Sequence, residues 1–362
     1  MLNWKYRSVF TQWPAAAPGQ RRVLLHVGLH KTGSTALQRF LSNAAEELRV
    51  QGVLYPTSGR PPTNPEGHHN IAWQMGGDRR FRSFAGTLDD IASEISSFPG
   101  DAILSSEDFE SILGTPIRLV PLLEHPLLKD HAFTIVFWVR DQASYLESLF
   151  FEMLHHRMAE EAARFCEAAL AYGQVRHEDW TFHIDYGSIR AGLLGLRAKI
   201  AVRPYARVIG GSTVIDCLTF AGLSCNASGS EERANSRGSL AEALSLFCQH
   251  RLGKAFADRV APYEDLLPLL NGRSAHLSSS FRAALIARFA AGNKRLAKSC
   301  RFPVETLTIH PFVPVDSVPL EAVFSLRTQS VFADLTRDNV NTTEPQSILS
   351  TAVDNLFHTI WR

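Results

Sequence analysis

The sequence predicts an α/β protein, with a mostly parallel sheet flanked by helices and further helices toward the C-terminus. Two observations carry this prediction. Short apolar runs alternate with segments of helical periodicity between residues 22 and 225. Hydrophobic residues also make up 45% of the 362 residues, which is enough to bury a large core and excludes wholesale disorder.

Five apolar runs are candidate strands. The first, residues 23–27, stops at Gly28, and the others occupy residues 53–55, 102–105, 133–139 and 199–203. Short, continuously apolar runs are typical of strands that are covered on both faces of a parallel sheet. We therefore expect an open, mostly parallel sheet built from these five runs.

Apolar residues recur at helical spacing after the first run, from Leu37 to Leu48, and Gly52 ends that helix. A second helix is expected directly after Arg140. Further helices are expected at residues 240–252, 280–299 and 348–360.

These segments predict an N-terminal arm (residues 1–21), an α/β domain (residues 22–255) and a helical C-terminal extension (residues 256–362).

The charge balance argues against a nucleic-acid binder, because 37 lysines and arginines face 36 aspartates and glutamates. No apolar run approaches the roughly 18 residues that a membrane span needs, and no signal-peptide pattern opens the chain. The five cysteines are scattered without a CxxC pair, which is typical of reduced thiols. We therefore expect a cytoplasmic protein without a transmembrane segment. The sequence does not predict an oligomeric state.

Residues 28–35, GLHKTGST, lie between the first candidate strand and the first helix. Such a turn directs backbone N–H groups and a helix N-terminus at one point, which suits an anion. The nucleotide-triphosphate loop GxxxxGK[ST] carries its lysine directly after the second glycine. Here Ser34 has that position, and the lysine of the loop is Lys31. A lysine in the middle of the loop is better placed to contact a group that leaves a single 5′-phosphate than to contact a polyphosphate bound beside magnesium.

Residues 24–38 resemble the 5′-phosphosulfate-binding loop of sulfotransferases that use 3′-phosphoadenosine 5′-phosphosulfate (PAPS), in the bacterial branch with an HKTG[ST]T core. The resemblance implies a P-loop-NTPase-like sheet. It also implies that Lys31 stabilises the leaving phosphate. The donor-binding residues that it implies in this loop are Lys31, Thr32, Gly33, Ser34 and Thr35.

The family's second element is a strand that ends in arginine, followed by a helix with a serine, and Arg140 and Ser148 match it. The resemblance implies that both bind the 3′-phosphate of the donor, and it extends more loosely to Arg237. An arginine offers a phosphate a two-pronged hydrogen bond. The other interpretation of Arg140 is an ion pair with Asp141 or Glu147.

Transfer of a sulfuryl group to a hydroxyl needs a base that takes the proton from that acceptor hydroxyl. Three residues are candidates for this base. Glu107 comes first, because it follows the strand at residues 102–105, where cytosolic relatives carry a catalytic histidine. The other interpretation of Glu107 is a residue of a helix's first turn. His68 and His69 are the alternatives, since an imidazole titrates near neutral pH. They can equally be ordinary surface histidines.

The predicted function is transfer of the sulfuryl group of PAPS to a hydroxyl on a carbohydrate, glycan or glycolipid, without a metal. Trp73 and Trp180 are candidates for stacking on a sugar ring. One alternative is a nucleotide kinase or related phosphotransferase, which the missing lysine at Ser34 disfavours. Another is a non-catalytic protein that binds the desulfated product, 3′-phosphoadenosine 5′-phosphate (PAP).

Overall fold

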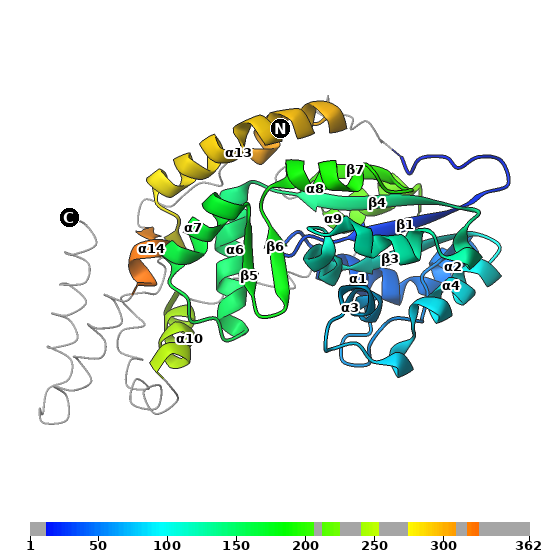
Figure 1. The fold of residues 1–362 in the computed structure, drawn as a ribbon, viewed down its shortest axis with the longest axis horizontal. Coiled ribbons are helices and arrows are strands. Elements are labelled where there is room, and N and C mark those ends of the chain that lie inside the picture. Colours follow the sequence, from blue (N-terminus) through cyan, green and yellow to red (C-terminus); the bar gives the residue numbers. More distant parts are fainter. Residues whose placement is uncertain (1–11, 206–211, 225–239, 253–273, 309–316, 326–362) are drawn as a thin grey trace, which may run out of the picture. The chain divides into compact units, whose positions relative to one another are not determined.

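The computed structural model describes residues 12–205, 212–224, 240–252, 274–308 and 317–325 (Figure 1). The chain divides into two compact units, each assembled from separated stretches. The first unit comprises Met1–Asp141, Gly173–Ala234 and Phe289–Ile309, and the second comprises Gln142–Tyr172, Asn235–Arg288 and His310–Arg362. This division is discontinuous along the chain, whereas the segments predicted from the sequence (1–21, 22–255 and 256–362) are contiguous.

The first unit contains a five-stranded sheet in which every pairing is parallel. Its strands are β1 (Arg21–Val27), β2 (Val53–Leu54), β3 (Asp101–Ser106), β4 (His131–Val139) and β7 (Lys199–Pro204). Their order is β2-β3-β1-β4-β7, and the register pairs Leu25 of β1 with Leu104 and Ile135 of its two neighbours. The predicted α/β class with a mostly parallel sheet is confirmed, and all five expected strands are present.

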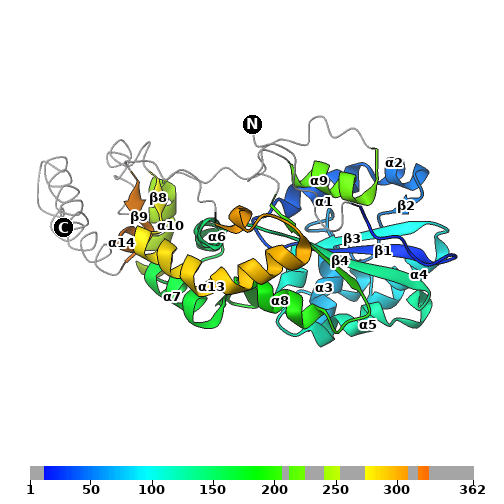
Figure 2. The ribbon, with the colours of Figure 1, turned by 90° about the horizontal axis from the view of Figure 1, so that it is seen from above.

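Helices cover both faces of this sheet (Figure 2). On one face lie α1 (Ser34–Asn43), α2 (Ala45–Val50) and α9 (Thr213–Ala221). On the other lie α3 (His69–Gly76), α4 (Leu88–Ser97), α5 (Val120–Leu123) and α8 (Tyr186–Leu193). The first unit is therefore a three-layer arrangement of helices, sheet and helices.

Successive residues of β1 pack on opposite faces, which gives the unit two separate cores. Val23, Leu25 and Val27 belong to a core shared with α3 and α4. Leu24 belongs to a core shared with α1 and α9. Trp13, in the expected N-terminal arm, is buried in this second core. The continuous apolar character of the strand follows from burial on both faces.

Shorter elements complete the first unit. The short 3₁₀ helices are η1 (Ser83–Ala85), η2 (Glu107–Ile112), η3 (Pro116–Leu119), η4 (Pro126–Leu128) and η7 (Val304–Leu307). The strands β5 (Gln174–His177) and β6 (Trp180–His183) form an antiparallel hairpin. Of these, η2 follows β3 directly and carries three acidic side chains, Glu107, Asp108 and Glu110.

The second unit is mainly helical. It contains α6 (Gln142–His155), α7 (Ala162–Tyr172), α10 (Leu240–Leu252), α14 (Leu320–Val323) and the short parallel pair β8 (Ala275–His276) and β9 (Val318–Pro319). Its core includes edge-to-face contacts of Phe150 with Phe165 and Phe324, and of Phe324 with Phe247. The buried carboxylate of Glu147 accepts a hydrogen bond from the Leu277 N–H at 2.8 Å.

The helix α13 (Ser279–Cys300) contributes residues 279–288 to the second unit and residues 289–300 to the first. It confirms the helix expected at residues 280–299. The helix expected at residues 348–360 and the candidate Arg237 lie outside the described residues.

Cys166, Cys217 and Cys300 are buried free thiols. In the described ranges, no helix combines the length and the apolar character needed to cross a bilayer.

Candidate functional site

Two glycines shape the loop that joins β1 to α1. A Cβ on Gly28 would lie 2.3 Å from Ser34 Oγ, so a side chain there would collide with the start of α1. Gly33 has a φ of 91° and Lys31 a φ of 59°, both in the left-handed region that favours glycine. A lysine in this conformation is strained, as residues at ligand-binding sites often are.

The N-terminus of α1 keeps its backbone donors available. Its N-cap is Gly33, which has no side chain to accept from the first turn of the helix. Ser34 is buried at this end, whereas Thr35 is exposed. In the part of the chain that the structure describes, no side chain caps these N–H groups, and together with the helix dipole they favour an anion in front of the loop.

Side-chain hydroxyl groups stabilise the loop by hydrogen bonds to its backbone carbonyls. Thr32 Oγ1 donates to the Leu29 carbonyl at 2.6 Å, and Ser34 Oγ approaches the same oxygen at 3.4 Å. Thr213 Oγ1, at the start of α9, donates to the Thr32 carbonyl at 2.8 Å. These hydrogen bonds hold the loop in its conformation and direct the hydroxyl groups of Thr32 and Ser34 at a protein carbonyl.

Arg140 lies directly after β4, next to this loop. Its Nη1 donates to the Lys31 carbonyl at 3.1 Å. Its guanidinium group packs over the ring of Tyr205, which follows β7, at 5.4 Å from the ring centroid. The carboxyl ends of β1, β4 and β7 thus bring Lys31 and Arg140 to one edge of the sheet.

Ser148, the other residue predicted to bind the 3′-phosphate, is half-buried in α6 and belongs to the second unit. Its role beside Arg140 stays a prediction, as does the role of Arg237.

His68, a candidate base, uses both of its ring nitrogens within the protein. Nε2 donates to the Pro56 carbonyl at 3.0 Å, and Nδ1 accepts from the Ser105 N–H at 3.1 Å. The side chain is fully buried, and burial lowers its pKa to about 3. A histidine held in this way has no nitrogen left for an acceptor hydroxyl, which argues against His68 as the base.

His69, the neighbouring candidate, forms a pair with Asp108. Its Nδ1 lies 2.9 Å from Asp108 Oδ2 and 2.9 Å from Ser106 Oγ. Because a carboxylate can only accept, Nδ1 carries a proton in this pair. Within the described part of the chain, Nε2 is buried and has no hydrogen-bond partner. A Cβ on Gly67 would come within 2.5 Å of it, so this glycine provides the room for the ring.

The charges in this pair stabilise each other. Burial by itself raises the pKa of Asp108, but the hydrogen bond from His69 and the positive charges of His69, Arg80 and His30 hold that pKa well below its usual value. Burial by itself lowers the pKa of His69, but the Asp108 hydrogen bond and the charges of Glu107 and Asp108 raise it above the usual value. Each member of the pair therefore favours the charged form of the other.

Glu107, the first candidate base, is the first residue of η2 and is half-buried. Its carboxylate accepts a hydrogen bond from the side-chain amide of Gln38 on α1. The sheet order positions it, because the carbonyl of the preceding Ser106 accepts from the Gly28 N–H at 3.1 Å. Glu107 is thus a carboxylate at the edge of the sheet that carries the loop, and it remains partly exposed.

The structure reveals a further pair that the sequence analysis does not predict, between His30 of the loop and Glu110 of η2. Glu110 Oε2 accepts from the His30 N–H at 2.8 Å and lies 2.7 Å from His30 Nδ1. The two residues are 80 positions apart in the sequence. No local pattern links them, and only the adjacency of β1 and β3 brings them together.

Trp73 and Trp180, the candidates for stacking on a sugar ring, both pack against protein groups. The Arg80 guanidinium lies 4.8 Å from the Trp73 ring and 5.0 Å from the Trp180 ring. Trp73 also stacks on His69 and Trp180 on His177. Each indole therefore already contacts a guanidinium group and an imidazole, which leaves less of its surface for a sugar.

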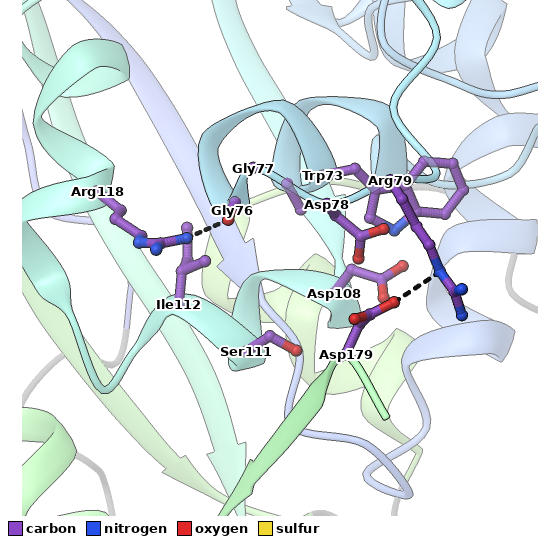
Figure 3. A pocket seen from close by; sticks show the side chains of 11 residues that line it. Trp73, Gly76, Gly77, Asp78, Arg79, Asp108, Ser111, Ile112, Arg118 and Asp179 are labelled. Carbon is purple, nitrogen blue, oxygen red and sulfur yellow. Dashed lines mark hydrogen bonds and ion pairs between the residues drawn. The ribbon is translucent and has the colours of Figure 1, made fainter. Parts of the chain in front are cut away.

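A pocket of about 260 Å³ opens beside Asp108, between α3, η2 and the β5–β6 turn (Figure 3). Polar groups dominate its wall. Arg79 Nε lies 2.9 Å from Asp179 Oδ2 at one side, and Arg118 donates to the Gly76 carbonyl at the other. Residues 28–35 are not among the residues that line it.

Comparison of the chain with protein-family models, with curated proteins and with solved structures found no match.

Proposed function

We propose that this protein is a PAPS-dependent sulfotransferase built on a P-loop-like α/β fold. One observation carries the proposal. Lys31 and Arg140 meet at the edge of the sheet where the N-terminus of α1 offers its backbone donors, with Arg140 Nη1 3.1 Å from the Lys31 carbonyl. A donor with one phosphate on each side of a ribose requires two cationic contacts held at a fixed spacing.

The roles follow from the chemistry. Lys31 stabilises the charge that develops on the 5′-phosphate oxygen as the sulfuryl group departs. The N–H groups of residues 32–35 bind that phosphate. Arg140 binds the 3′-phosphate, with Ser148 and Arg237 as further candidates. This reaction needs no metal, since no polyphosphate has to be neutralised.

We propose Glu107 as the base that takes the proton from the acceptor hydroxyl. It is half-buried, so an acceptor can reach it, whereas the free nitrogen of His69 is enclosed and His68 is fully engaged. The bond to Gln38 ties the carboxylate to α1, the helix that carries the donor loop. His69, paired with Asp108, remains the second candidate.

The acceptor that we propose is a carbohydrate, glycan or glycolipid hydroxyl. The pocket beside Asp108 supports this class through its charged and polar wall, which offers both donors and acceptors to a polyhydroxylated group.

Kinase chemistry is the alternative, and the loop disfavours it. Ser34 stands where a triphosphate loop carries lysine, and its hydroxyl is directed back at Leu29. Asp101 begins β3 rather than following it, and its carboxylate accepts from the Arg22 N–H at 2.7 Å. It is therefore not placed to hold magnesium beside the loop.

Calorimetric titration with PAP, AMP and Mg·ATP tests the proposal. Tight binding of PAP without metal, with much weaker binding of AMP and Mg·ATP, is the expected result. Lys31→Ala is the matched variant, because it removes the loop cation and leaves the strand and helix intact. Preference for Mg·ATP would replace the proposal with a kinase-like function, and absence of binding to all three would refute both.

If PAP binds, transfer of label from [³⁵S]PAPS to 4-nitrophenyl glycosides tests the acceptor class. Glu107→Gln should then reduce transfer by about 10²–10⁴-fold, the usual contribution of a general base, while PAP binding persists. Equal transfer by Glu107→Gln and the wild type would shift the role to His69.

A further inference from the structure

One carboxylate holds His30, the residue before Lys31, at two points. Glu110 Oε2 accepts from its backbone N–H at 2.8 Å and lies 2.7 Å from its Nδ1. The other carboxylate oxygen accepts from the His183 N–H of β6 at 2.8 Å. Because Glu110 is 0% exposed, its carboxylate is fixed in place and fixes the loop in turn.

The second ring nitrogen of His30 stays accessible. The side chain keeps 15% of its surface exposed, and among the described residues the ring's hydrogen-bond contact is made through Nδ1, not Nε2. Phe182 packs edge-on against the ring, with centroids 4.8 Å apart and planes at 88°. Glu110 and Phe182 thus determine the orientation of the ring, and its exposed part is open to a ligand. His69, in contrast, has its Nε2 enclosed.

The groups around His30 determine its charge. These groups are Glu110, Glu107 and Asp108 of η2, His69 of α3, Lys31 of the loop, and Phe182 and His183 of β6. Burial by itself lowers the pKa of His30, but the hydrogen bond to Glu110 and the charges of Glu110, Glu107 and Asp108 raise it above the usual value. The contact with Glu110 therefore favours the imidazolium form of the ring, in which one N–H is donated to Glu110 and the other can be donated to a ligand.

We propose that His30 is a donor-binding residue whose imidazolium, oriented by Glu110, gives the anionic phosphosulfate group a second positive charge beside Lys31. Glu110 is then a positioning residue that acts through His30 and never contacts the donor. This inference rests on the proposed function, because it requires an anionic donor in the loop.

Titration of the full-length protein with PAP between pH 7.5 and 9 tests the inference, since a phosphate monoester is fully ionised above its second pKa near 6. Affinity of the wild type should fall as pH rises and His30 loses its proton. His30→Gln should weaken binding by about 10–100-fold at pH 7.5, the value of a hydrogen bond to a charged group, and should flatten this pH dependence. Lys31 is present in both proteins, so the difference between the two curves isolates His30.

Glu110→Gln provides the readout that a merely structural role would not give. It keeps an oxygen to accept from the His30 N–H but removes the charge, so the midpoint of the pH dependence should move to lower pH. Asp89→Asn is the matched control, because Asp89 is exposed and pairs with His125 Nε2 at 2.9 Å in another histidine–carboxylate pair of the same unit. It should bind PAP as the wild type does. If Glu110→Gln does not fold, the PAP affinity of His30→Gln and its pH dependence still test the role of His30.

The two proposals fail in different ways. If PAP binds to the wild type, and His30→Gln has the same affinity and the same pH dependence, the role of His30 is refuted and the proposed function stands. If the wild type does not bind PAP, the proposed function is refuted and the inference falls with it.

Discussion

Acidification is expected to destabilise the first unit through two histidines that are buried in their neutral form. His26 of β1 and His68 before α3 are both fully buried, and burial lowers the pKa of each from 6.5 to about 3. His26 Nδ1 lies 2.7 Å from Ser105 Oγ, and its ring packs edge-on against Trp138. Neither site offers a carboxylate partner among the described contacts, so a proton there would be costly.

The sign of the effect follows from proton binding. Below pH 6.5 the unfolded chain binds a proton at each histidine, whereas the folded protein does so only near pH 3. The free energy of unfolding therefore falls as the pH drops from about 6.5 toward 3. Proton linkage gives a loss of about 2 kcal/mol per histidine between pH 7.5 and 5, and thus about 4 kcal/mol for the pair.

Urea denaturation of the wild type and of His26→Asn at pH 7.5, 6.5, 5.5 and 5 measures this loss. The asparagine amide can keep the bond to Ser105 but cannot take up a proton. Its cavity lowers stability by a similar amount at every pH, so the slope against pH is the informative quantity. The variant should lose about 2 kcal/mol less than the wild type between pH 7.5 and 5. His155→Asn controls for removal of an exposed histidine.

Parallel curves for His26→Asn and the wild type would refute this reasoning, since they would mean that His26 binds no fewer protons in the folded state than in the unfolded state. The raised pKa values of His30 and His69 act in the opposite direction. Their contribution to stability is complete below about pH 6.5 and is lost as the pH rises through their folded values. Stability should therefore be highest near pH 6.5.

Three further predictions concern the site. Arg140→Ala should weaken PAP binding by about 1.5–3 kcal/mol, the value of a charge-assisted hydrogen bond, and should affect AMP much less; equal losses in calorimetry would exclude a 3′-phosphate contact. Gly28→Ala should reduce PAP binding more than tenfold, because its Cβ would lie 2.3 Å from Ser34 Oγ, and adding Ser34→Gly should restore part of the affinity. Asp108→Asn should lower the pKa of His69, because it removes the charge that raises it; an NMR titration of ¹⁵N-labelled histidine that gives the same pKa in both proteins would contradict the pairing.

The sequence determined the local elements. All five apolar runs are strands of the sheet, the loop of residues 28–35 joins β1 to α1, and the helix expected after Arg140 begins at Gln142. These features can be predicted from the sequence because burial on one or two faces of an element produces a periodic pattern of hydrophobic residues. The loop can be predicted for a similar reason, because its glycines are required by a contact with Ser34 and by the backbone angle of Gly33, both within the loop itself.

Only the tertiary structure decided which polar groups meet. The sequence left His68 and His69 open, and the fold gives His68 two backbone partners and His69 the Asp108 carboxylate, 39 positions away. It likewise pairs His30 with Glu110. These contacts depend on the strand order β2-β3-β1-β4-β7, which sets the end of β3 beside the end of β1. Periodicity reports which side of a segment is buried, but not which distant segment covers it, so hydrogen-bond partners across the sheet edge can be read only from the folded chain.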